Sequence, residues 1–104
     1  MNLRELILDE MRAFEDWVSI ADVLKAMGTT SWVADRDDVR RILDCVDTSD
    51  RLRLGRVSDR FDEIAEPLPV TELVDAIFSE AGPADRSAAM MELFIAERDS
   101  PQSG

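Results

Sequence analysis

The chain has 104 residues, the length of one domain, and its 45% of hydrophobic residues are enough for a single shallow core. It contains no histidine and one cysteine, Cys45, so the sequence excludes a disulfide framework and a structural zinc site. With 23 acidic and 12 basic residues the net charge is −11, which favours basic partners and disfavours nucleic acid.

The charge is unevenly distributed along the chain. Residues 1–34 carry six acids and three bases, residues 35–60 carry seven of each, and residues 61–104 carry ten acids and two bases. The acidic excess therefore lies mostly in the C-terminal part. It is either a property that faces a partner or a trait of a salt-adapted or high-GC source, and the sequence leaves both interpretations open.

The N-terminal residues favour an amphipathic helix. Their apolar spacing predicts a helix over about 3–14, with Asn2 as its N-cap. Acidic residues stand where a signal peptide needs a basic start, and no apolar run approaches the roughly 18 residues of a membrane span. We therefore expect a cytoplasmic protein without a membrane partner.

A short segment of β character and a well-marked helix follow. Trp17 and Val18 have β character, and we expect the indole to pack into the core. The next helix extends over about 19–27. Ser19 and Asp22 have the spacing of a capping box, and Gly28 is a suitable C-terminal stop.

The sequence predicts the central part of the third helix but leaves two alternatives for its first residue. Apolar residues at helical spacing predict a helix over about 37–46, with Val39, Ile42, Leu43 and Val46 on the buried side. The helix begins either there, capped by Asp35 with Asp38, or near Ser31. The earlier start would place Trp32 on the buried face.

Beyond the turn at 47–50, the residues of 51–57 alternate between arginine and apolar side chains, which predicts a half-buried strand. The segment 58–65 favours a capped helical turn over a second strand. After the break at 67–69 we expect a helix that has Val70 as its staple, is capped by Thr71 and stops at Gly82 and Pro83. Another helix is expected over about 85–98.

The last two helices form a predicted hairpin over residues 67–98, and the polar tail 99–104 is expected to be disordered. The apolar stripe of the second helix is wider than a small domain needs, which indicates an interaction surface. The hairpin packs on the first helix or pairs with a second copy of the chain. The expected surface consists of Met90, Met91, Phe94 and Ile95.

The order of a first helix, a capped second helix, a striped third helix and an alternating strand resembles the winged-helix/helix-turn-helix superfamily over residues 3–57. The resemblance implies a mainly α fold in a single domain over 1–98. Its N-terminal core would hold three helices plus a short β strand or hairpin, followed by two C-terminal helices. It also implies DNA contacts, made by Arg36, Arg40 and Arg41 in the major groove and by Arg51, Arg53 and Arg56 on phosphates.

The sequence contains no phosphate loop, nucleophile motif or metal-ligand spacing, so we expect no enzyme, no cofactor and no metal site. Our first hypothesis is a non-enzymatic protein-interaction or regulatory module, acidic and dimeric through the C-terminal helices. The alternative is a small DNA-binding transcription regulator, which the net charge disfavours. A third possibility is an acidic surface that mimics DNA and occupies a basic partner.

Overall fold

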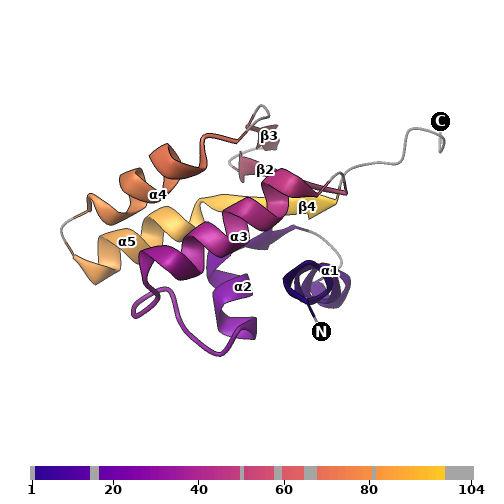
Figure 1. The fold of residues 1–104 in the computed structure, drawn as a ribbon, viewed down its shortest axis with the longest axis horizontal. Helices are drawn as coiled ribbons and strands as arrows, with labels where there is room; N and C mark the ends of the chain where they lie inside the picture. The colour runs from indigo at the N-terminus through magenta and orange to yellow at the C-terminus, as the bar shows by residue number, and fades with distance from the viewer. Residues whose placement is uncertain are drawn as a thin grey trace.

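The computed structural model describes residues 2–14, 17–49, 51–57, 60–64, 68–80 and 82–97. Both helices and strands occur along these residues, as Figure 1 shows. Their order is α1 (Leu3–Phe14), β1 (Val18–Ser19), α2 (Ile20–Ala26), α3 (Arg36–Thr48), β2 (Leu52–Val57), β3 (Phe61–Glu63), α4 (Val70–Phe78), α5 (Pro83–Met91) and β4 (Leu93–Glu97).

The predicted fold class is wrong, because the molecule is a mixed α/β protein and not a mainly α one. In the described part of the chain the strands form one four-stranded antiparallel sheet in the order β1-β4-β2-β3. The sheet therefore includes β4, a strand in the segment that was predicted to be the second C-terminal helix. The sheet is not formed by residues 3–57 alone, because residues 93–97 supply strand β4.

The second C-terminal helix is shorter than predicted. Helix α5 ends at Met91, and the residues expected to be its second half form strand β4. Leu93 and Ile95 of this strand are 2% and 0% exposed, and Ala96 on the other side of the strand is 3% exposed. A strand buried on both faces has a nearly continuous apolar sequence, and that run produced the wide apparent helix stripe.

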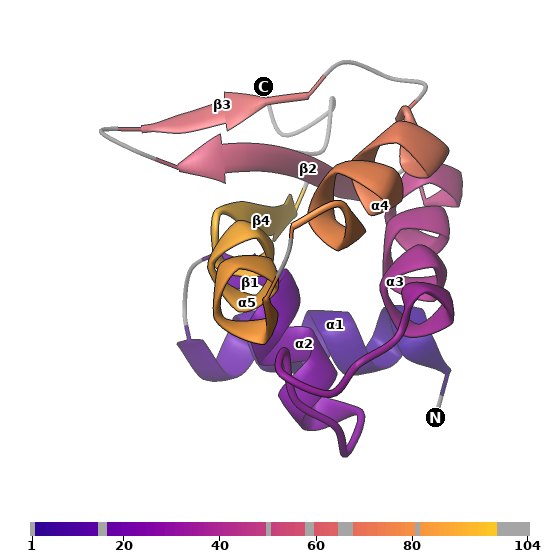
Figure 2. The same ribbon diagram turned by 90° about the vertical axis from the view of Figure 1, so that its left-hand side faces the viewer.

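Strand β4 lies in the middle of the sheet and pairs with β1 on one side and with β2 on the other. Ile95 is opposite Val18 on one side and opposite Leu54 on the other, and all three side chains are 0% exposed. This row faces the helices. In Figure 2, helices α1 to α4 lie on one side of the sheet, and α5 runs into β4.

The segment 61–63 is a strand, so the prediction of a helical turn there is also wrong. Strand β3 pairs with β2 through Gly55↔Glu63 and Val57↔Phe61. The backbone N–H of Ile64 also donates to the carbonyl oxygen of Leu54 at 2.8 Å. These partners lie in an earlier segment of the chain, and local periodicity contains no information about them.

The first three helices agree with the sequence prediction. Helix α2 has the expected capping box between Ser19 and Asp22. Helix α3 begins at Arg36 with a capping box between Asp35 and Asp38, which decides between the two starts that the sequence left open. In contrast, Thr71 is not the cap of α4, since Pro69 occupies that position without a side-chain hydrogen bond.

The sheet face opposite the helices carries a small aromatic cluster. The rings of Trp17 and Phe61 have centroids 5.5 Å apart, and the guanidinium of Arg53 lies 4.8 Å from the Phe61 centroid. Trp17 is half-buried in this cluster. A Cβ atom on Gly55 would come within 2.7 Å of the Phe61 ring and 2.6 Å of the Asp62 carbonyl oxygen. Only glycine lets Phe61 lie this close to β2.

We expect Gly55→Ala to lower the free energy of unfolding by about 1–3 kcal/mol, because the methyl group must displace Phe61 or the β3 backbone. Urea denaturation measures the change. Gly82→Ser is the matched control, because its new Cβ meets nothing within 4 Å and α5 has no side-chain cap. Serine at this N-cap should leave stability unchanged or raise it by a few tenths of a kcal/mol. Equal losses in the two variants would contradict the close packing at Gly55.

Candidate functional site

Helix α4 lies along the flank of α3 that carries two of the predicted DNA-contacting arginines. Arg36 forms an ion pair with Asp75, and its guanidinium lies 5.7 Å from the centroid of the Phe78 ring. Arg40 Nη2 donates to Thr71 Oγ1 at 3.2 Å. Figure 2 shows the two helices side by side.

The C-terminal end of α3 is also joined to the segment that leads into α4. Asp47 Oδ1 accepts a hydrogen bond of 2.8 Å from the backbone N–H of Leu68. Together with the contacts of Arg36 and Arg40, this bond extends the association of the two segments along the length of α3. The arginine flank of α3 is therefore an intramolecular surface.

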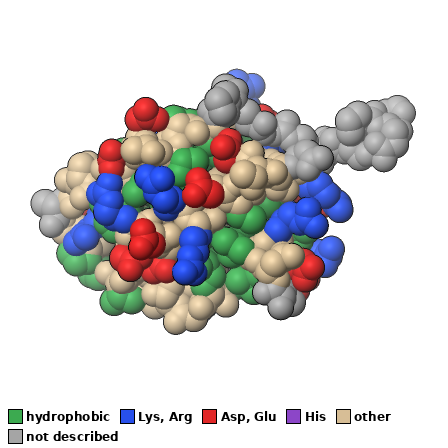
Figure 3. Space-filling model, in the orientation of Figure 1, with side chains coloured by type: hydrophobic (Ala, Val, Ile, Leu, Met, Phe, Trp, Pro, Cys, Tyr) green, Lys and Arg blue, Asp and Glu red, His purple; other side chains and the backbone are tan. Residues whose placement is uncertain are grey.

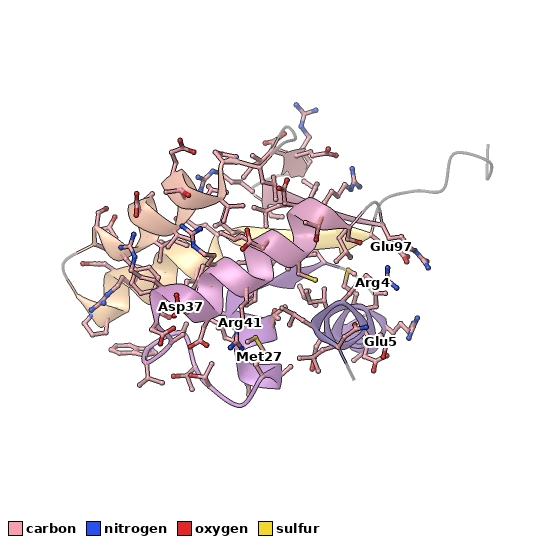
Figure 4. The ribbon with its side chains drawn as sticks, viewed as in Figure 1. Arg4, Glu5, Met27, Asp37, Arg41 and Glu97 are labelled. Atoms are coloured by element: carbon pink, nitrogen blue, oxygen red, sulfur yellow. The ribbon has the colours of Figure 1, made fainter. Side chains whose placement is uncertain are left out.

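The outward face of α3 presents Arg41 with Asp37 and Asp44 close to it in the helix. Asp37 precedes Arg41 by four residues and Asp44 follows it by three, so both carboxylates lie on the same face. Figure 4 labels Asp37 and Arg41 on this helix. Arg41 has no hydrogen bond or ion pair with another residue that the structure describes. The net charge of this face is negative.

The strand arginines that were expected to meet phosphates are mostly engaged with acids. Arg51 pairs with Glu97 at 3.0 Å, and Arg53 pairs with Glu63 at 3.3 Å. Arg56 is exposed, and its side chain forms no hydrogen bond or ion pair with the residues that the structure describes. The six predicted arginines are thus not gathered on one free surface.

The predicted interaction surface on the C-terminal segment is divided between core and surface. Met90 and Ile95 are 0% exposed and contribute to the hydrophobic core. Phe94 is half-buried, and its neighbours in the sheet are Ser19 on β1 and Gly55 on β2. Met91 alone of the four is largely exposed, at 54%.

Three large hydrophobic side chains are exposed in the described part of the chain. Trp32 is 59% exposed, Val33 is 74% exposed, and Met91 is 54% exposed. Sequence reasoning missed Trp32 and Val33, because an early start of α3 would have buried the indole. The Asp35/Asp38 capping box was the signal that could have placed both residues outside the helix.

The loop that carries Trp32 and Val33 is fixed against α5. Ser31 Oγ and Ser87 Oγ share a hydrogen bond of 2.6 Å, and these two serines are only 9% and 4% exposed. Met91 lies four residues after Ser87, about 6 Å along the helix axis. Trp32 and Val33 are adjacent in this loop, and we call the region that they form beside α5 the loop–α5 patch.

The backbone of this loop is also held by local bonds. Gly28 ends α2 with a φ of +92°, a conformation that L side chains rarely adopt. The backbone N–H groups of Val33 and Ala34 both donate to the Thr30 carbonyl oxygen, at 3.3 and 2.9 Å. Ala34 is 8% exposed and belongs to the core. Trp32 thus projects from a defined turn.

Cys45 is a nucleophilic side chain that the sequence analysis left without a role. Cys45 is half-buried on α3, and burial raises the pKa of its thiol while the nearby Arg4 guanidinium lowers it in part. A raised pKa keeps the thiol protonated and weakly nucleophilic at neutral pH. The described residues contain no group of three or more His, Cys, Asp or Glu side chains that could hold a metal ion.

No helix in the described ranges has the length and apolar character needed to cross a membrane.

Comparison with known proteins found no family model that matches the chain, and no curated protein and no solved structure with significant similarity to it.

We expect Ser31→Ala and Ser87→Ala each to lower the free energy of unfolding by about 1–3 kcal/mol, because each leaves the other hydroxyl buried without its partner. The double variant should lose less than the sum of the two single losses. A double-mutant cycle by urea denaturation measures this coupling. Ser79→Ala, at an exposed position, is the control and should change stability by less than about 0.5 kcal/mol. Additive losses would show that the loop is not anchored through this bond.

Proposed function

We propose that the chain is a non-enzymatic protein-interaction or regulatory module with an acidic surface. The observation that carries this proposal is the packing of α4 on the arginine flank of α3, where Arg36 pairs with Asp75 and Arg40 bonds to Thr71. Four of the six arginines that DNA binding would require contact other side chains of the same chain: Arg36, Arg40, Arg51 and Arg53. The acidic residues supply the surface that a partner meets.

The size of the DNA major groove supports this proposal. The groove is about 12 Å wide, and one α-helix with its side chains is about 10–12 Å in diameter. A single helix fits, but α3 with α4 along its flank is wider than the groove. The net charge of −11 adds a repulsive field toward phosphates.

A DNA-binding transcription regulator is the alternative, and one observation favours it. The hairpin of β2 and β3 follows α3 directly, which is the position of the wing in the winged-helix proteins that residues 3–57 resemble. In that case Arg41 and Arg56, whose side chains form no ion pair within the described part of the chain, would meet the phosphates. The approach would have to use the outward face of α3 and the hairpin.

Two further expectations belong to the proposal. The first is a cytoplasmic location, which rests on the N-terminal sequence. The second is a homodimer through the C-terminal helices. Helices α4 and α5 already pack on α3 and α2 of their own chain, so a second copy would have to use their remaining outward faces.

A gel-shift assay on random duplex DNA at low salt tests the proposal, because low salt gives a weak electrostatic binder its best chance. We expect no shift. Arg41→Glu and Arg56→Glu are compared with Arg12→Glu, which lies on α1 in an exposed pair with Asp9. All three variants change the net charge by the same amount, so only a site-specific contact distinguishes them.

A shift that is lost in Arg41→Glu and Arg56→Glu but kept in Arg12→Glu would overturn the proposal and establish the regulator alternative. Light scattering on the same samples gives the oligomeric state. A concentration-independent monomer mass would contradict the homodimer.

A further inference from the structure

We propose that the loop–α5 patch is the docking surface for a protein partner that presents basic side chains around an apolar pocket. This inference rests on the proposed function and specifies where the partner binds and what chemistry it brings. Its central contact is the indole of Trp32, supported by Val33. The patch combines exposed apolar area, a fixed backbone and acidic neighbours, and each feature points to the same kind of partner.

The exposed apolar area of the patch comes from two neighbouring residues. Trp32 and Val33 are two of the three large hydrophobic residues that the described structure leaves exposed, and the Ser31–Ser87 bond holds their loop against α5. Single exposed apolar residues are common on protein surfaces, whereas a contiguous group marks an interaction site. Tryptophan in particular is enriched among the residues that dominate binding energy. In Figure 3, hydrophobic side chains reach the surface where α5 begins and the α2–α3 loop passes.

The fixed backbone lowers the cost of binding through this patch. Ser31 is buried and bonded to α5, and Ala34 on the other side of the exposed pair belongs to the core. The loop therefore does not have to become ordered when a partner binds, and the free energy of burying the indole is retained. A loop with no anchor would lose part of that free energy to conformational entropy.

The charges beside the patch determine which partner fits. Asp35 and Asp37 are exposed and Asp38 is half-buried at the start of α3, directly after the loop, and Asp85 is exposed on α5. Acidic side chains gather over the start of α3 in Figure 3. A partner with Lys or Arg around its apolar pocket would complement them and associate faster at low salt.

The two arginines nearest to the patch in sequence do not neutralise it. Arg36 and Arg86 both lie over the Phe78 ring, with guanidinium carbons 5.7 and 5.9 Å from its centroid. Arg36 is also paired with Asp75 on α4. Both cations are therefore directed toward α4, and the acids remain beside Trp32.

A second copy of the chain is a poorer occupant than a basic partner. A symmetric contact at this patch would bring the exposed carboxylates beside it, Asp35, Asp37 and Asp85, close to those of the second copy. A membrane surface rich in anionic lipids would be repelled for the same reason. Charge complementarity thus selects a basic protein segment.

Selection from a phage-displayed library of random peptides against the whole chain tests the proposal. We expect the enriched peptides to combine Lys or Arg with apolar residues. Fluorescence anisotropy with the labelled peptides then gives the dissociation constants. Trp32→Ala should weaken binding about 30-fold or more, as expected for a residue of this kind. Because Trp32 is 59% exposed, the variant should unfold at nearly the same temperature as the parent.

Two isosteric charge variants separate a local contact from the general field. Asp37→Asn and Glu72→Gln each remove one carboxylate from an exposed position in the first turn of a helix, α3 in the first case and α4 in the second. Both lower the magnitude of the net charge by one. We expect Asp37→Asn to weaken peptide binding more than Glu72→Gln does.

Each outcome has a definite meaning. Failure to enrich any peptide, enrichment of acidic or neutral peptides, or binding that Trp32→Ala leaves intact would overturn the docking surface. Self-association that Trp32→Ala abolishes would assign the patch to a second copy and would also overturn it. None of these results would affect the wider proposal, which only a site-specific DNA shift contradicts.

Discussion

The rest of the structure depends on the position of strand β4 between β1 and β2. β1 has only two residues and pairs only with β4 among the described strands, so residues 93–97 connect the beginning of the chain to its middle. Strand β3 is at the edge of the sheet and β4 is at its centre. Helices α4 and α5 connect these two strands and therefore lead the chain back across the molecule. Helix α4 then lies on α3, and α5 lies beside α2 and the loop that follows it. Burial of Val18, Ile95 and Leu54 in one row stabilises this closure.

The same closure determines which residues are available at the surface. It brings Asp75 and Thr71 to the arginine flank of α3, so that Arg36 and Arg40 contact their own chain. It also brings Ser87 to Ser31, which fixes the loop and leaves Trp32 exposed. These two consequences of the closure are the observations on which the proposal of a protein-interaction module rests.

The sequence predicts what is local and fails where the partner is distant. The capping boxes at Ser19/Asp22 and Asp35/Asp38 are complete within four residues, and the structure contains both. The pairing of β4 with β1 joins segments more than 70 residues apart, so periodicity could not reveal it, and the buried strand was interpreted as part of a helix. The candidate site follows the same rule. The arginines were visible in the sequence, but the Arg36–Asp75 pair spans 39 residues, and the exposure of Trp32 depends on the Ser31–Ser87 bond across 56.

The position of β4 can be measured directly by nuclear Overhauser effects between backbone protons in solution. We expect cross-strand contacts that connect Leu54 to Ile95 and Ile95 to Val18, together with slow amide exchange in β4 that requires global unfolding. That result would establish the closure on which the α3–α4 packing and the anchored loop both depend. Contacts between residues three apart across 93–97, typical of a continued helix, would contradict it and return the C-terminal segment to a helical hairpin.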